Sequence, residues 1–179
     1  MSKKVLIISS SPRRGGNSEA LADEFARGAA EAGNCVEKIC LYDKKISFCI
    51  GCFACLNTHR CVIHDDADII AQKMLVSDVL VFATPVYYYS VSGQLKTMLD
   101  RANPLYSADY AFKDVYLLAS AAEDESNTFD GTEKAVQGWV DCFEKARLYK
   151  TIFAGGVNAV GEIKGHKALL EAYEMGKKV

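Results

Sequence analysis

Short apolar, β-branched runs alternate with amphipathic helical patterns along the whole chain, and this alternation restricts the possible folds more than any other feature. Five runs have the length and composition of buried strands: residues 3–9, 35–42, 78–84, 114–120 and 149–155. Helical patterns follow them over residues 17–33, 65–74, 92–102, 132–147 and 164–177. Such an alternation predicts right-handed crossovers and a parallel sheet that is covered by helices on both faces.

The number of strands selects among folds of this class. Five strands favour a flavodoxin-like, doubly wound α/β fold with strand order 2-1-3-4-5 over a six-stranded dinucleotide fold. At 179 residues, the chain is predicted to form one domain, residues 1–179, with a cysteine-rich loop at about 43–65. Ligands of such sheets bind beyond the carboxyl ends of the strands, which selects the loops after Ser9, Thr84 and Ser120.

The charge and the first residues of the chain exclude several kinds of partner. A net charge of −2 gives no electrostatic reason to expect nucleic acid or an anionic membrane. The apolar run VLII near the N-terminus is too short for a signal peptide or a membrane span, so a cytoplasmic location is predicted. In that compartment a disulfide framework is not expected. Cys35, Cys40 and Cys142 are predicted to be buried packing thiols.

The other four cysteines lie within thirteen residues in a C-x2-C-x2-C-x5-C pattern: Cys49, Cys52, Cys55 and Cys61. The first two gaps match those of iron–sulfur ligands. Three interpretations stay open, namely a [4Fe–4S] cluster, a four-thiolate zinc site, and free thiols at a subunit interface. Structural zinc more often uses two separated cysteine pairs. His59 and His64 are not needed as ligands and are expected to be exposed.

The loop after the first strand, SSSPRRGGNS, is rich in hydroxyls, glycine and arginine and leads into a helix. The free N–H groups and the dipole at a helix N-terminus favour an anion. The loop lacks both the Walker ending and G-x-G-x-x-G, which counts against ATP, GTP and a dinucleotide bound in the Rossmann manner. A phosphate site is favoured over a turn in which Asn17 or Ser18 only caps the helix. Its predicted residues are Ser11, Arg13, Asn17 and Ser18.

Three segments, in order, resemble one family. SSPRRGGNSEAL is similar to the G-S-P-R-x-x-G-N-[ST] loop of the NAD(P)H-dependent FMN reductase superfamily of flavodoxin-like proteins. CIGCFACLNTHRCVIHDDADI and TPVYYYSVSGQLKTMLDR add two matches, and together the three most resemble the iron–sulfur flavoprotein branch. The resemblance runs over essentially the whole chain. It implies noncovalently bound FMN and a homodimer or homotetramer with flavins near the subunit interfaces.

In this family the loop after the third strand lines the flavin, so Pro85, Val86, Tyr87 and Tyr88 carry over by position. A proline-stiffened aromatic loop can lay a flat face against the isoalloxazine ring and direct N–H groups at its polar edge. The family's third loop is glycine-rich, whereas here it reads SAAEDE. Ser120 and Ala121 are assigned to the flavin, and the three acids are expected to point into solvent.

The resemblance implies an FMN-dependent oxidoreductase. NAD(P)H or a ferredoxin-like donor would reduce the flavin, and a quinone, another small acceptor or the cysteine-bound cluster would receive the electrons. Two alternatives stay open: an electron carrier without its own small-molecule substrate, and a module that has lost its cofactor. No Ser/His/Asp or Cys/His constellation is visible, and no side chain is assigned as an acid–base catalyst.

Overall fold

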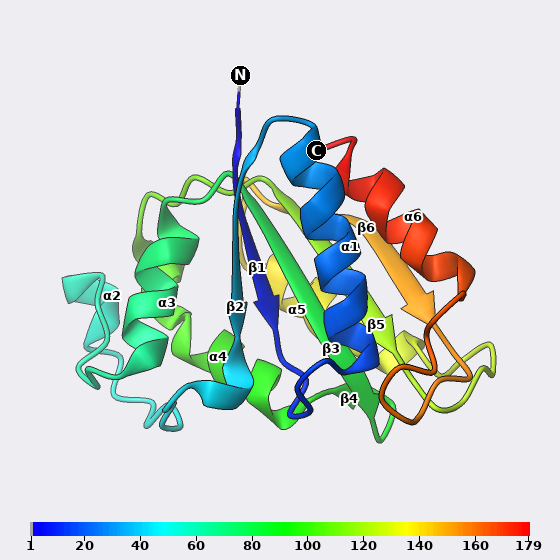
Figure 1. The fold of residues 1–179 in the computed structure, drawn as a ribbon. Helices are drawn as coiled ribbons and strands as arrows, with labels where there is room; N and C mark the ends of the chain where they lie inside the picture. The colour runs from blue at the N-terminus through cyan, green and yellow to red at the C-terminus, as the bar shows by residue number, and fades with distance from the viewer. Residues whose placement is uncertain (1) are drawn as a thin grey trace.

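The computed structural model describes residues 2–179 and is built on a parallel sheet in the order β2-β1-β3-β5-β6 (Figure 1). The strands are β1 (Lys4–Ser9), β2 (Cys35–Cys40), β3 (Val79–Tyr87), β5 (Asp114–Ser120) and β6 (Arg147–Ala154). The two-residue β4 (Ser90–Val91) pairs antiparallel with the end of β3. Without β4 the order is the predicted 2-1-3-4-5, which confirms the flavodoxin-like fold.

Helices cover both faces of the sheet. The longer ones are α1 (Asn17–Glu31), α3 (Asp66–Leu75), α4 (Gly93–Arg101), α5 (Asp130–Val140) and α6 (Lys167–Gly176), with short α2 (Cys55–Thr58), η1 (Leu41–Asp43) and η2 (Asn103–Ser107) between them. Helices α1 and α6 lie over one face, and α3, α4 and α5 lie over the other (Figure 1). Across residues 2–179, no helix combines the length and apolar character needed to cross a bilayer.

The central strands supply apolar side chains to two separate cores. Val5 and Ile7 of β1 pack in the core under α1 and α6, whereas Leu6 and Ile8 pack in the core under the other three helices. This division follows from the period of two residues in a strand. Because both faces are covered, the central strands are apolar at nearly every position instead of alternating with polar residues.

The structure corrects three local predictions. The helix expected over residues 132–147 ends at Val140, and the buried Phe143, whose ring lies 4.5 Å from Trp139, continues the apolar pattern from a turn. Residues 85–91, expected as a loop, extend β3 into a hairpin with β4. Cys35 and Cys142 are exposed and Cys40 is only half-buried, because β2 is an edge strand and Cys142 lies past the end of α5.

Candidate functional site

A pocket of about 190 Å³ opens at the carboxyl edge of the sheet, where the predicted loops converge. Nine of the ten residues predicted to bind the cofactor line it: Ser11, Arg13, Asn17, Ser18, Pro85, Val86, Tyr87, Ser120 and Ala121. Tyr88 lies outside this pocket with its side chain fully exposed. The fold therefore brings together residues that are up to 110 positions apart in the chain, from Ser11 to Ala121.

The first of these loops turns tightly on Ser11. Its hydroxyl accepts a hydrogen bond from Arg13 N at 3.1 Å and lies 3.0 Å from Arg13 O. A Cβ on Gly16 would stand 2.5 Å from Ser11 Oγ, so the close approach requires glycine at this position. Helix α1 begins at the next residue, and its first-turn N–H groups have no acceptor within the helix. This end of α1 has the geometry of an anion site.

The side chains around this helix terminus have distinct roles. Arg13 Nη1 donates to Asn158 O at 2.8 Å, and the Asn17 amide bridges to the same loop by donating to Ala159 O at 3.0 Å. The N-cap of α1 is Gly16, so neither Asn17 nor Ser18 acts as the cap. Ser18 Oγ is buried and has no hydrogen-bond partner within residues 2–179. A buried hydroxyl without a partner at a helix N-terminus fits a phosphate oxygen.

One lining segment was missed by the sequence analysis. Val157, Asn158 and Val160 follow β6 and close the pocket on the side of Arg13. Only the loops after Ser9, Thr84 and Ser120 were selected from the sequence. The signal for the missed segment was its position after the fifth strand, which ends at the same edge of the sheet.

The predicted ring-binding segment is a strained hairpin tip. Tyr88 and Tyr89 connect β3 to β4 with φ values of 49° and 60°, in the left-handed region that favours glycine. Tyr89 Oη donates to Glu123 Oε2 at 2.9 Å, and this contact raises the pKa of Tyr89. The three acids of the third loop, Glu123, Asp124 and Glu125, are exposed and do not line the pocket.

A buried serine pair fixes the first two loops relative to each other. Ser92 Oγ lies 2.9 Å from Ser10 Oγ, which donates to Ala83 O of β3 at 3.1 Å. Ser92 is also the N-cap of α4, where it accepts from Leu95 N at 3.3 Å. The loop after β1, the end of β3 and the start of α4 are therefore held as one unit.

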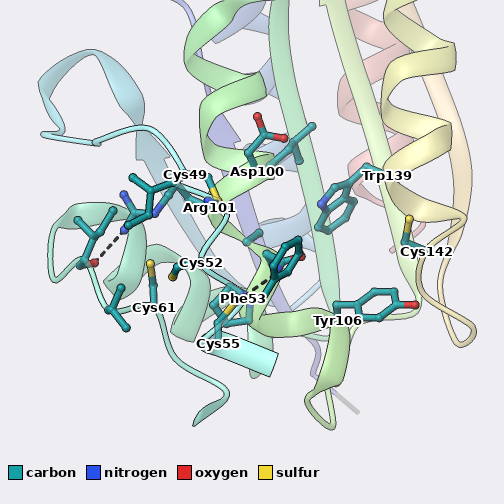
Figure 2. Close-up of a pocket in the computed structure, with 18 of the residues that line it drawn as sticks. Cys49, Cys52, Phe53, Cys55, Cys61, Asp100, Arg101, Tyr106, Trp139 and Cys142 are labelled. Carbon is teal, nitrogen blue, oxygen red and sulfur yellow. Dashed lines mark hydrogen bonds between the residues drawn. The ribbon is translucent and has the colours of Figure 1, made fainter. Parts of the chain in front are cut away.

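The four clustered cysteines line a second cavity of about 410 Å³, which shares no lining residue with the first pocket. Figure 2 shows Cys49, Cys52, Cys55 and Cys61 together, with Trp139 and Cys142 across the cavity. Two sulfurs already accept hydrogen bonds: Asn103 Nδ2 donates to Cys55 Sγ at 3.1 Å, and Gly51 N donates to Cys49 Sγ at 3.5 Å. N–H groups directed at thiolate sulfur are typical of iron–sulfur sites.

The arrangement of these cysteines bears on the type of metal centre. Among residues 2–179, no three His, Cys, Asp or Glu side chains converge closely enough to bind a single ion. A [4Fe–4S] cluster binds each thiolate at a different iron, and four cysteines on the wall of one cavity supply the donor set that such a cluster needs. His59 and His64 are exposed and do not line the cavity.

Arg101, at the end of α4, holds both ends of the cysteine loop. Its Nη1 donates to Ser47 O at 2.7 Å and to Asp65 Oδ2 at 2.8 Å, and its Nη2 donates to Ile63 O at 2.8 Å and to Asp65 Oδ1 at 2.9 Å. Asp65 also accepts from Ala67 N and so caps α3. Burial raises the pKa of Asp65, but the Arg101 guanidinium and the backbone donors outweigh this and lower it to about 2.

Comparison with known sequences supports the predicted family. A family model described as NADPH-dependent FMN reductase matches residues 3–140. An iron–sulfur flavoprotein of Methanocaldococcus jannaschii is 44% identical over 102 residues, which cover 57% of this chain and 53% of that protein. Another, from Methanosarcina thermophila, is 33% identical over 134 residues, or 75% of this chain and 69% of that protein. The match to the first relative thus spans about half of its length.

Solved structures share the fold over the whole chain. An NAD(P)H:quinone oxidoreductase from Methanothermobacter marburgensis has a TM-score of 0.79 at 18% identity, covering 99% of this chain and 96% of that one. An azoreductase from Bacillus anthracis has a TM-score of 0.75 at 19% identity, with both chains covered completely. At these identities the likeness shows the fold alone. On the strength of the family match, this chain belongs to the NADPH-dependent FMN reductase family.

Proposed function

We propose that this protein is an FMN-dependent oxidoreductase that takes electrons from NAD(P)H or a ferredoxin-like donor and passes them to a quinone or another small acceptor. The observation that carries the proposal is the convergence of the phosphate loop, the aromatic hairpin and Ser120–Ala121 on one pocket. When bound, FMN would supply the hydride and electron chemistry, and the chain would bind and orient it.

The phosphate end of the pocket is the best-defined part of the proposed site. Ser18 offers a buried hydroxyl that has no hydrogen-bond partner in the described part of the chain, and Arg13 offers a guanidinium that the loop after β6 holds in place. Ser11 shapes the loop and Asn17 fixes it to residues 159–163. Charge-assisted hydrogen bonds from Arg13, together with the N-terminus of α1, would stabilise a dianionic phosphate.

The ring end of the pocket is formed by residues with little charge. Pro85, Val86 and Tyr87 are the last residues of β3, Ser120 is the last residue of the neighbouring β5, and Ala121 follows it. A flat isoalloxazine ring would lie across these two strand ends. Tyr88 is assigned to the ring by family position, and from the hairpin tip it would contact the ring only at its outer edge.

We further propose a [4Fe–4S] cluster on Cys49, Cys52, Cys55 and Cys61. The shared cavity, the N–H donors directed at two of the sulfurs and the similarity to iron–sulfur flavoproteins support this assignment. A cluster would add one-electron transfer to the flavin chemistry. The electron carrier without its own substrate is the second candidate, because the two relatives described above are both named iron–sulfur flavoproteins.

The test is anaerobic purification followed by absorption spectroscopy and by flavin, iron and sulfide analysis. We expect one FMN and about four irons per chain. Flavin without iron would remove the cluster and leave the reductase proposal in place. A chain that takes up no FMN on titration would overturn both the reductase and the electron-carrier functions, because each depends on bound FMN.

Steady-state kinetics separate the two candidate functions. We expect turnover with NADH or NADPH and a quinone, the acceptor class in the name of the archaeal structural neighbour. Negligible turnover combined with rapid reduction by ferredoxin would favour the carrier. Cys52→Ser is expected to lose iron while retaining FMN, whereas Cys35→Ser, an exposed cysteine outside the cavity, should retain both.

A further inference from the structure

The guanidinium of Arg101 is buried and is fixed by several hydrogen bonds. The residue is 1% exposed, and its two terminal nitrogens make four hydrogen bonds to Ser47, Ile63 and Asp65. A guanidinium has five N–H groups, and these bonds use the four terminal ones. These four bonds fix the plane and the direction of the guanidinium.

The fifth donor, Nε–H, is buried and has no hydrogen-bond partner within residues 2–179. Leaving a buried donor of a charged group without a partner costs free energy, so such a group needs an explanation. Arg101 lines the cysteine cavity together with Cys61, and Figure 2 draws the two side chains beside each other.

The sequence points to the same neighbour. Cys61 is the last of the four cysteines, separated by a longer gap than the others and followed directly by the segment that Arg101 holds at Ile63.

We propose that Arg101 is a positioning residue of the metal centre, which holds the cysteine loop through its terminal nitrogens and donates its Nε–H to the Cys61 sulfur once that sulfur binds iron. The inference rests on the cluster in the proposed function. It assigns a donor to Cys61 that matches the roles of Asn103 toward Cys55 and of Gly51 N toward Cys49.

This contact has an electrochemical consequence. A hydrogen bond and a positive charge at a ligating sulfur stabilise the reduced cluster, which carries one more negative charge than the oxidised cluster. Arg101 therefore raises the reduction potential of the centre. A lysine at this position retains the charge, but its single ammonium group cannot reproduce the planar, five-donor geometry.

The test compares the wild type with Arg101→Lys and Arg101→Gln, with Lys96→Gln as the control. Lys96 lies on the same helix, is exposed, and forms its ion pair with Asp100. The first measurement is the midpoint potential of the cluster by an EPR-monitored redox titration. We expect a lower potential in both Arg101 variants, with the greater shift in Arg101→Gln, and the wild-type potential in Lys96→Gln.

The second measurement does not depend on a loaded cluster. Hydrogen exchange of residues 47–65 in the metal-free protein is expected to be faster in both Arg101 variants and unchanged in Lys96→Gln. Arg101 variants that load iron and retain the wild-type potential would overturn the sulfur contact while leaving the proposed function intact. A wild-type protein that binds no cluster under anaerobic reconstitution would overturn the proposed metal centre, and this inference with it.

Discussion

At the scale of single residues, two neighbouring arginines differ in what they contact. Arg13 lines the pocket at the carboxyl edge. Arg14 does not line this pocket, and its guanidinium carbon lies 4.6 Å from the centroid of the Tyr42 ring. We expect Arg13→Ala to weaken FMN binding roughly 10- to 100-fold, the loss of a hydrogen bond to a charged group. Quenching of flavin fluorescence measures the affinity. Arg14→Ala removes the same charge, and an equal loss there would show that Arg13 makes no specific phosphate contact.

A second residue-scale prediction concerns the turn between β3 and β4. Tyr88 has a φ of 49° and a fully exposed side chain, so it contributes strain without packing. We expect Tyr88→Gly to raise the free energy of unfolding by about 0.5–1 kcal/mol, since glycine adopts this conformation freely. Urea denaturation measures the change. Tyr88→Ala removes the same ring but retains the strain, so a gain in that variant would contradict the explanation.

At the scale of elements, α1 and α6 approach each other through a reciprocal pair of glycines. A Cβ on Gly28 would stand 2.1 Å from Tyr173 O, and one on Gly176 would stand 2.2 Å from Phe25 O. We expect Gly28→Ala to destabilise the fold by about 1–3 kcal/mol, because the helices would have to separate. Gly138→Ala on the exposed side of α5 meets no neighbour and should stabilise by up to about 1 kcal/mol. Thermal unfolding of both variants tests the contrast.

The junction of the cysteine loop with α3 and α4 predicts a pH dependence. The pKa of Asp65 in the folded protein is about 2, below its ordinary value of 3.8, because Arg101 and backbone donors outweigh the effect of burial. Because this pKa is lower in the folded chain than in the unfolded chain, ionised Asp65 stabilises the fold. Its contribution of about 2 kcal/mol to the free energy of unfolding is present above about pH 4 and is lost as the pH falls toward 2. Asp65→Asn retains a capping side chain but should be less stable at pH 7 and lose less stability between pH 4 and 2. Parallel unfolding curves for the two proteins across this range would contradict the assignment.

At the scale of the whole molecule, the pocket at the carboxyl edge and the cysteine cavity share no lining residue, and the cysteine loop exposes large apolar side chains. Phe48 is 78% exposed, Ile50 68% and Phe53 66%. A cluster of exposed apolar residues of this kind marks an interaction surface. We expect a homodimer or homotetramer in which this loop is covered. Light scattering should give two or four times 19.6 kDa for the wild type, and a smaller assembly for Phe48→Ser.

Leu170 offers a matched control for this prediction, because it is 65% exposed on α6, far from the loop in the fold. Leu170→Ser should leave the mass unchanged. A monomeric wild type, or an equal effect of both substitutions, would remove the loop as a subunit contact.

The sequence by itself determined the class of fold and most of the residues that line the pocket at the carboxyl edge. Apolar, β-branched runs identified every strand of the parallel sheet, and the loop around Arg13 and Ser18 was recognisable as a candidate phosphate loop because such loops have a local pattern of residues. The early end of α5 could not be read, since Phe143 is apolar and in phase although it packs from a turn. The helix propensity of a segment does not show where tertiary contacts will end the helix.

Only the tertiary structure decided how distant segments combine. No motif marks Asn158 as a site residue, because it contacts Arg13 only through the position of the loop after β6 at the carboxyl edge of the sheet. The sequence places Arg101 at the end of an ordinary helix. In the structure it donates to the carbonyl of Ser47 in the cysteine loop, 54 residues earlier in the chain. Motifs are encoded over neighbouring residues, whereas a buried guanidinium obtains its partners from the packing of the whole chain. For that reason the family and the class of fold followed from sequence, whereas the contacts of Arg101 with the cysteine loop followed from structure alone.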